Sequence, residues 1–522
     1  MTCGSCIFTL LQCFCYCSFV IATSNSTNLH QQEAWPNLSS TRAVAMRTQR
    51  DISENATITD EIVIGVNLSS VIFEQFGYNS DSLSDINTLL DVGVQALYID
   101  LYYNEYSRDW SLCPLESLIT NNSSKRCERP QTFNITSLIG VINNIISLTD
   151  TVLNTNPLYL LISVHSMVFT ESKYITGIHY LESAFHAVNN LVMPSDLNIS
   201  SMPSLKKLLF TDNLRAFAVL INDDLQVNTT YKENSDLNTI FISSTLLGTQ
   251  RWKQISHNHP TLPVIWKDIN TIDNETISNT TESSFRFTYS DDNLTLDRFV
   301  NSIRTGYSPI ISQKFTKLSD ISTYLEFSSW SWAIYQPTFE NAGSASDEKS
   351  SSEIAKLNRC AIITSSGWKV AKCGDKYRIL CRSSKRPHTF AVSKLYSNYL
   401  TASELCYNLG SEYDIAIPNT AFEQDKAIKM LSSFDSGLWI DINSLSSSNC
   451  WVKGLNAICP YQKTISRMIF IRMITPAAVI AFILLSLLTL LQFNRVPVHQ
   501  NRRRWRKLAQ DHIANDVEGV PS

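Results

Sequence analysis

The sequence is poor in charge. Of its 522 residues, 17 % are Asp, Glu, Lys or Arg, against roughly 25 % in an average soluble domain. Neither sign dominates, because 43 basic and 47 acidic residues leave a net charge of −4, and this balance excludes a globally basic nucleic-acid-binding protein. With 15 Gly and 16 Pro, the chain also lacks the composition of collagen-like or low-complexity proteins. Its length indicates two or three domains.

The short motifs of common catalytic and metal sites are absent as well. The sequence contains no GxSxG, no HExxH, no P-loop and no GxGxxG, and each of these would have pointed to a particular chemistry. A CxxC…CxxC pattern, which is typical of structural zinc, is also missing. We therefore expect neither a metal site nor a cofactor.

Two segments have no charged side chain at all. Residues 1–24 contain the apolar run Cys6–Ile21 and end in small residues, which predicts a cleaved signal peptide. An uncleaved N-terminal anchor is the alternative. Met473–Phe493 carries no charge over 21 residues. As a helix it would span about 31 Å, enough to cross a bilayer core, so it is a predicted transmembrane helix.

Basic residues flank the second segment unequally. Three lie on its N-terminal side, Lys463, Arg467 and Arg472, and six follow it: Arg495, Arg502, Arg503, Arg504, Arg506 and Lys507. The positive-inside rule places residues 494–522 in the cytosol as a tail, so we expect a single-pass type I membrane protein. The stretch Arg502–Lys507 could also contact anionic lipid. We favour topology as its explanation, because topology alone accounts for the charges.

Sequons for Asn-linked glycosylation agree with a luminal or extracellular location. They occur at Asn25, Asn37, Asn55, Asn67, Asn121, Asn122, Asn134, Asn198, Asn228, Asn274, Asn279 and Asn293. All of them precede residue 300, and we expect a glycoprotein. Asn67 is the expected exception, because it lies beside a predicted buried strand.

Cysteine usage indicates the same compartment. Five of the 13 cysteines lie in the predicted signal peptide, and the other eight are Cys113, Cys127, Cys360, Cys373, Cys381, Cys406, Cys450 and Cys459. An even number in an oxidising lumen predicts disulfides. Cys113 and Cys127 stand apart from the others, and we expect them to pair. The remaining six allow 15 pairings, among which the sequence does not choose.

Residues 61–340, which follow a polar segment at 25–60, alternate between short apolar runs and amphipathic stretches. The predicted strands are Ile62–Val66, Ala96–Leu101, Leu158–Val164, Ala216–Ile221 and Leu262–Trp266. The predicted helices are Asp81–Asp91, Ile135–Leu148 and Thr176–Asn190. This alternation favours an α/β fold with a parallel sheet, and at this length a complete or degenerate TIM-like barrel.

Composition separates a second part. Residues 341–354 are a predicted linker, and residues 355–465 are rich in cysteine. The predicted helix Ala402–Gly410, the predicted strand Gly437–Asp441 and the tryptophan and cysteines of Gly367–Arg382 resemble a small C-type lectin-like α+β module, although their order differs from a simple copy. The tripeptide that binds calcium in sugar-binding lectins is missing. We therefore expect this module to bind protein or to act as a scaffold.

Polar residues follow the predicted strands. They are Asn67, Asp100, His165, the run Asn222–Asp224, Lys267 and Asp268. In a barrel these strand ends converge on one face, where His165 and Asp100 could perform general acid–base chemistry on a phosphodiester or a glycoside. We favour the simpler interpretation, because strand ends meet solvent in any α/β fold and polar residues are expected there.

Several segments together resemble a known family. They are RTQRDIS (47–53), IGVNLSSVIF (64–73), GVQALYIDLYYNEYSRDWSLCP (93–114), SVHS (163–166), WSWAIYQP (330–337), GWKVAKCGDKYRILCR (367–382) and LWIDIN (438–443). The chain resembles the fungal maintenance-of-telomere-capping membrane proteins, the sixth so named. This resemblance implies a type I membrane glycoprotein with a role in telomere capping and without an assigned activity.

The predicted barrel is also similar to phosphatidylinositol-phospholipase-type phosphodiesterases. In that family a first strand ends in a catalytic His and a second in an Asp–x–Arg pair. Here Asn67 stands at the first position and Tyr102 at the Arg position, whereas Asp100 matches and His165 could match a second His. The two departures argue against phosphodiesterase activity.

We favour a non-enzymatic membrane glycoprotein whose ectodomain binds an unknown luminal protein or glycan. A luminal protein cannot contact telomeric DNA, so we expect an indirect role in capping and no direct nucleic-acid contact. Two alternatives stay open. One is a luminal phosphodiesterase or glycosidase that uses His165 and Asp100, and the other is a lectin-like receptor that signals through its tail.

Overall fold

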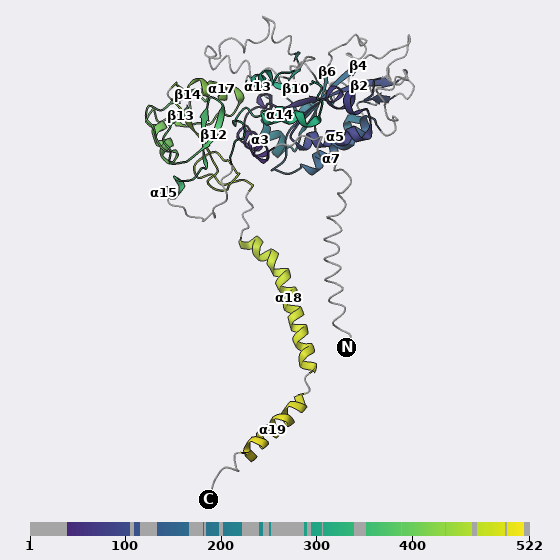
Figure 1. The fold of residues 1–522 in the computed structure, drawn as a ribbon, viewed down its shortest axis with the longest axis vertical. Coiled ribbons are helices and arrows are strands. Elements are labelled where there is room, and N and C mark those ends of the chain that lie inside the picture. Colours follow the sequence, from purple (N-terminus) through teal and green to yellow (C-terminus); the bar gives the residue numbers. More distant parts are fainter. Residues whose placement is uncertain are drawn as a thin grey trace. The chain divides into compact units, whose positions relative to one another are not determined.

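The structure is a computed structural model that describes most of the chain (Figure 1). The described residues are 39–104, 109–114, 133–165, 181, 184–197, 202–221, 240–243, 250–251, 287–289, 294–304, 306–338, 351–387, 389–433, 435–461, 467–495 and 498–515. The chain forms two units, Met1–Tyr461 and Gln462–Ser522, and each is considered by itself.

A parallel sheet curves through the first part of the larger unit. Its strands are β1 (Gly65–Asn67), β2 (Ala96–Asn104), β4 (Leu158–His165), β5 (Leu191–Val192), β6 (Ala216–Ile221), β7 (Ile242–Ser243), β8 (Gln250–Arg251), β9 (Phe287–Tyr289) and β10 (Ser308–Ile311). The path of pairs runs from β6 through β4, β2, β1, β10 and β9 to β8. β5 and β7 share the other edge of β6, and β3 (Asp109–Ser111) runs antiparallel to β2. Among the described strands no pair joins β7 to β8, so the described barrel is partial.

Most local predictions are confirmed. β6 and α7 (Ile135–Leu148) have the predicted bounds, β2 and β4 extend their predictions at the C-terminal end, and α5 (Ser80–Asp91) begins one residue early. β1 is shorter than predicted and begins at Gly65. The predicted strand Leu262–Trp266 lies outside the described residues, as does most of the predicted helix Thr176–Asn190.

Side chains alternate between the two faces of the sheet, as they must in a barrel. Ala96, Tyr98, Tyr159 and Phe217 fill the interior, and the rings of Tyr159 and Phe217 stack with centroids 4.6 Å apart. The residues that alternate with them along the strands, such as Leu97, Leu160 and Ile162, point outward and pack in the core beneath the helices.

Two helices over the barrel, α5 and α7, begin at side-chain caps. The Oδ1 atom of Asn79 accepts a hydrogen bond from the Ser82 amide (3.0 Å) at the start of α5, and Asn134 does the same for Ser137 (2.9 Å) at the start of α7. Gly93 follows α5 with φ +97°, a conformation that glycine adopts without strain. The other described helices of this part are α3 (Ser40–Ile52), α4 (Glu74–Phe76), α13 (Leu296–Arg304) and α14 (Ile321–Glu326).

The cysteine-rich part is an α+β module. Its six strands are β11 (Cys360–Thr364), β12 (Gly367–Ala371), β13 (Arg378–Ser383), β14 (Phe390–Val392), β15 (Tyr413–Ile415) and β16 (Leu438–Asn443). Its helices are α15 (Ser351–Ile354), α16 (Ala402–Tyr407) and α17 (Ala421–Lys429).

Three disulfides close this module, and each joins cysteines that are consecutive in the sequence. They are Cys360–Cys373, Cys381–Cys406 and Cys450–Cys459, which selects one of the 15 pairings left open by the sequence. Cys113 is also disulfide-bonded. Its predicted partner, Cys127, lies outside the described residues.

The barrel and the module share one hydrophobic core. Trp332, just after the barrel, lies with its ring centroid 5.6 Å from that of Trp368 and 4.9 Å from that of Trp451, both in the module. Gly367 permits this approach, because a Cβ atom there would lie 2.8 Å from the Ala333 nitrogen. The predicted linker therefore connects two parts that pack together, although its residues 341–350 lie outside the description.

The smaller unit contains two helices, α18 (Arg467–Arg495) and α19 (Val498–Asn515). α18 covers the predicted transmembrane segment 473–493. Within the described residues, no helix is long and apolar enough to cross a membrane.

Candidate functional site

Two of the polar residues predicted at the strand ends, Asp100 and His165, lie at the C-terminal ends of the neighbouring strands β2 and β4. In the sheet register Asp100 of β2 is opposite Ser163 of β4, and Tyr102 is opposite His165. Asp100 and His165 are therefore two residues apart in register on neighbouring strands. Strand spacing and rise place their backbones roughly 8 Å apart. Asp100 is buried, whereas the side chain of His165 lies outside the description.

Asn67 at the end of β1 is engaged in local structure. Its Oδ1 atom accepts hydrogen bonds from the backbone amides of Ser69 (3.0 Å) and Ser70 (3.3 Å). The carboxamide thus caps the turn that follows β1. Unlike the imidazole of a histidine, it has no nitrogen that can accept a proton.

A buried aromatic residue crowds the same end of the barrel. Tyr78 is 1 % exposed, with its ring centroid 5.3 Å from that of Phe73. Burial, with the nearby charges of Glu74 and Asp100, raises the pKa of the Tyr78 hydroxyl. The remaining strand-end candidates, Asn222–Asp224, Lys267 and Asp268, lie outside the described residues.

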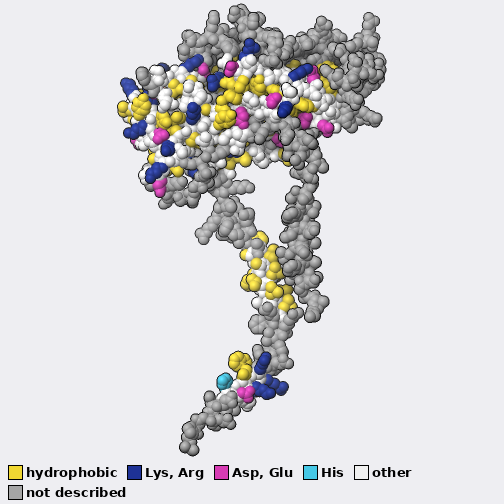
Figure 2. Space-filling view, in the orientation of Figure 1, with side chains coloured by type: hydrophobic (Ala, Val, Ile, Leu, Met, Phe, Trp, Pro, Cys, Tyr) yellow, Lys and Arg dark blue, Asp and Glu magenta, His cyan; other side chains and the backbone are white. Residues whose placement is uncertain are grey.

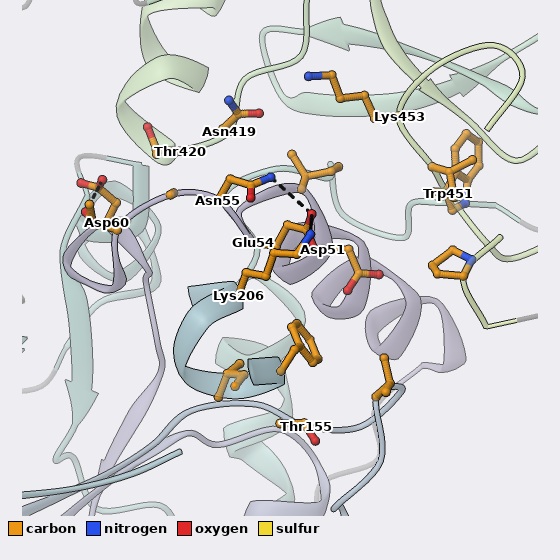
Figure 3. Close-up of a pocket in the computed structure, with 18 of the residues that line it drawn as sticks. Asp51, Glu54, Asn55, Asp60, Thr155, Lys206, Asn419, Thr420, Trp451 and Lys453 are labelled. Carbon is orange, nitrogen blue, oxygen red and sulfur yellow. Dashed lines mark hydrogen bonds and ion pairs between the residues drawn. The ribbon is translucent and has the colours of Figure 1, made fainter. Parts of the chain in front are cut away.

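A cleft of about 1250 Å³ opens on the opposite face of the barrel (Figure 3). Its barrel wall comes from residues 51–60, 150–155 and 202–213, which directly precede β1, β4 and β6. The cleft is therefore at the N-terminal ends of the strands, away from Asp100 and His165. Its other wall comes from the module, at residues 382–387, 419–423 and 451–461. We call it the N-face cleft.

Helix α3 joins the two walls of the N-face cleft. The guanidinium of Arg50, which is 2 % exposed, donates to the carbonyls of Thr155 (2.5 Å) and Val152 (3.0 Å) on the barrel side. It also donates to the Tyr461 hydroxyl (2.7 Å) on the module side, and that hydroxyl donates to Asp51 (2.5 Å). One buried arginine thus connects groups that are far apart in the sequence.

The C-terminal end of α3 and the residue that follows it make further contacts with both parts. Gln49 accepts from the Trp330 amide (3.1 Å), the Ser53 hydroxyl donates to the Asn419 carbonyl (2.8 Å), and Arg47 donates to the Asn449 carbonyl (3.0 Å). These bonds set the position of the module relative to the barrel, and with it the width of the N-face cleft.

The polar lining of the cleft contains charges of both signs. Lys206 pairs with Glu54 (3.0 Å) on the barrel wall, and Arg382 pairs with Glu423 (2.6 Å) on the module wall. Lys453 is exposed at the module wall, with Asp51 and Asp60 on the barrel wall. Such a lining, with Trp451 and Phe210 among its apolar members, suits a ligand that has both polar and apolar groups. Within the described part of the chain, no group of three or more His, Cys, Asp or Glu could hold a metal ion.

A buried carboxyl lies beneath helix α3. Glu61 is 9 % exposed, and burial raises its pKa from 4.5 to about 7, with Arg50 acting in the opposite direction and Asp60 in the same one. Glu61 shares a small cavity with Arg42, Arg50 and Gln95. Burial also lowers the pKa of Arg42 to about 9.

One predicted glycosylation site lies on the cleft. Asn55 is exposed, and its Nδ2 atom donates to Glu54 (3.3 Å) (Figure 3). Among the other sequons, only Asn67 and Asn134 fall in the described residues, and both accept hydrogen bonds from backbone amides of the following turn. The remaining nine lie outside the description.

Our sequence analysis did not predict the N-face cleft. Its walls meet only in three dimensions, since Arg50 and Tyr461 are 411 residues apart. A local signal was present in the density of charged residues over 47–61, where two arginines are followed by four acidic residues, which is unusual in a chain this poor in charge.

The match to one family model agrees with the partial barrel. A family model described as "MTC6 partial TIM-barrel domain" matches residues 36–331. A Maintenance of telomere capping protein 6 from Lachancea thermotolerans is 30 % identical, covering 94 % of this chain and 96 % of the relative. Another from Komagataella phaffii is 27 % identical, covering 94 % and 97 %. Among solved structures, a calcium-dependent phosphoinositol-specific phospholipase C from a Pseudomonas species is similar at a TM-score of 0.35 and 10 % identity. That match covers 54 % of this chain and 96 % of the enzyme.

Proposed function

The chain belongs to the maintenance of telomere capping protein 6 family, and from that membership we propose that it is a membrane-anchored luminal glycoprotein that binds a partner and supports telomere capping indirectly. The capping role is taken from the names of its relatives. A luminal ectodomain would be separated from telomeric DNA by a membrane, so its effect would pass through its partner.

The proposed topology is a cleaved signal peptide at 1–24, an ectodomain, an anchor at 473–493 and a cytosolic tail. The apolar side chains of α18 support the anchor, because Ile480, Phe482 and Leu485 are 60 %, 73 % and 62 % exposed. An apolar surface of this kind favours a lipid environment. The disulfides and the sequons support an oxidising, glycosylating compartment.

Binding by the ectodomain is supported chiefly by the N-face cleft. It is shared by the barrel and the module, and contacts of α3 with both parts set its width. At the strand ends, in contrast, Asn67 caps a turn where a catalytic base would be needed. This contrast favours recognition over catalysis.

We further propose that the module is lectin-like in fold and serves recognition of a protein or a glycan. Two helices, α16 and α17, and a six-stranded sheet closed by disulfides support this assignment. The alternative enzyme would use Asp100 and His165. It is supported by the register of β2 and β4, which places the two residues near each other on neighbouring strands.

A cell-based complementation experiment separates these functions. Full-length variants are expressed in cells that lack the endogenous protein, and single-stranded telomeric DNA is measured. We expect Lys206→Glu together with Lys453→Glu, which reverses two charges in the cleft, to abolish complementation. His165→Ala should complement fully.

A matched control is available away from the cleft. Lys314 pairs with Glu74 and Lys429 pairs with Asp425, as Lys206 does with Glu54, but neither lines the cleft. Lys314→Glu with Lys429→Glu should therefore complement. Loss of complementation by His165→Ala, accompanied by loss of phosphodiester hydrolysis in the purified protein, would establish the enzyme instead.

A further inference from the structure

Helix α19 exposes large apolar side chains on one face. Trp505, Leu508 and Ile513 are 68 %, 50 % and 66 % exposed. At 100° per residue they fall within an arc of about 140°, together with Ala509. All described side chains of this helix, at residues 502–513, are exposed.

Basic residues lie mainly around the rest of the circumference. Arg503 and Lys507 lie on the side opposite Trp505, and Arg504 and Arg506 flank the apolar arc. Arg502 and His512 lie within the arc. Asp511 is the one acidic residue of the helix. Figure 2 shows the apolar and basic side chains of α19 on different sides of the helix.

This arrangement exceeds what membrane topology requires. The positive-inside rule depends on the number of basic residues near the membrane and not on how they are placed around a helix. It also does not require Trp505, Leu508 and Ile513 to share a face. An apolar stripe bordered by arginines is typical of helices that lie in a membrane interface, because arginine side chains reach from there toward the headgroups.

We propose that α19 lies in the plane of an anionic membrane surface, with Trp505, Leu508 and Ile513 inserted and the five basic residues contacting lipid headgroups. Charge complementarity favours lipid over a protein groove, since five cations and one acid face an anionic leaflet. Two residues separate α18 from α19, so a membrane that contains α18 is within reach. The inference rests on the proposed anchor in one respect only: the anchor decides that α19 meets the cytosolic leaflet.

Hydrogen exchange of the full-length chain in lipid vesicles tests this inference. Vesicles of phosphatidylcholine are compared with vesicles containing three parts in ten of phosphatidylserine. We expect the amides of residues 502–513 to exchange at least about tenfold more slowly in the anionic vesicles. Equal exchange in the two membranes would overturn the proposal.

Two double variants with the same change in charge separate insertion from simple attraction. Leu508→Glu with Ile513→Glu alters the apolar arc, and Gln510→Glu with Ala514→Glu alters the opposite face. The first should lose the slowed exchange and the second should retain most of it. If both double variants lose the slowed exchange, or if neither does, insertion through the apolar face is contradicted.

The anchor is tested separately in the same samples. Resistance to extraction at alkaline pH reports on α18, and the α19 variants should leave it unchanged. If the chain is extracted, the anchor fails, and flotation of the extracted chain with anionic or neutral vesicles still tests α19.

Discussion

At the scale of single residues, the buried charge of Arg50 connects the two walls of the N-face cleft. Its guanidinium is almost fully buried and donates hydrogen bonds to acceptors on the barrel side and on the module side of the cleft. A buried arginine is tolerated when its donors are all engaged, and it is costly to remove because its partners are then left unpaired.

Arg50→Lys is therefore expected to destabilise the ectodomain by about 3 kcal/mol, because an ammonium cannot reach the same spread of acceptors. Denaturant unfolding of the ectodomain measures this change. Arg47→Lys is the control on the same helix, since Arg47 makes one exposed hydrogen bond to Asn449 and a cation–π contact with Tyr461 that lysine can also make. It should cost less than about 1 kcal/mol. If the two substitutions lowered the free energy of unfolding equally, the contacts of Arg50 would be no more important than those of Arg47.

Glu61 gives the ectodomain a predictable dependence on pH. Its pKa is 4.5 when solvated and about 7 in the fold, so between these values the unfolded chain loses the proton first. Stability should fall as pH rises through this window, by about 3 kcal/mol in total, and then level off above pH 7.

Glu61→Gln should flatten this dependence and raise the free energy of unfolding at pH 8, because the neutral amide carries no desolvated charge. At pH 4 the variant and the natural chain should be equally stable, which serves as the internal control. Thermal unfolding across pH 4–8 measures both. A variant that is less stable at every pH would show that Glu61 is required as a carboxylate.

At the scale of elements, the loop closed by Cys450–Cys459 shapes one wall of the N-face cleft. It carries Trp451, Lys453 and Ile458, all of which line the cleft. The loop has little regular secondary structure, so the disulfide restricts its conformations.

Replacing both Cys450 and Cys459 by Ser should destabilise the ectodomain by about 2–3 kcal/mol through loss of loop-closure entropy. We expect faster proteolysis within residues 451–459, while β11 to β16 keep their protection. Limited proteolysis with mass spectrometry makes this measurement. Uniform loss of protection over the module would mean instead that the loop supports the whole sheet.

At the scale of the whole molecule, the barrel and the module are joined by a core and not only by the chain. Trp332 packs between Trp368 and Trp451, and α3 contacts both parts. No disulfide among the described residues links the two parts.

A protease site inserted within residues 341–350 should therefore cut the chain without separating the halves. Size-exclusion chromatography of the cut ectodomain under native conditions should give one peak containing both fragments. Trp332→Ala in the same cut chain should release the module, because it removes a ring from the centre of the shared core. Separation of the unsubstituted halves would show that the linker holds them together.

Local features of the fold could be predicted because they depend on neighbours in the sequence. The runs at 135–148 and 216–221 carry the periods of a helix and a buried strand, and both elements appear with the predicted bounds. Consecutive pairing of the six module cysteines was one of many possibilities, since it depends on which strands become neighbours. The position of Asp100 and His165 on neighbouring strands followed from the parallel sheet.

The sequence by itself determined the α/β character, the positions of elements such as α7 and β6, and the apolar character of segment 473–493 within α18, since each depends on local periodicity and charge. The tertiary structure decided the contacts that span hundreds of residues: Arg50 with Tyr461, Trp332 with Trp451, and the N-face cleft between the barrel and the module. These depend on burial and hydrogen bonding between distant segments, and a burial preference in one segment does not specify which distant segment will cover it.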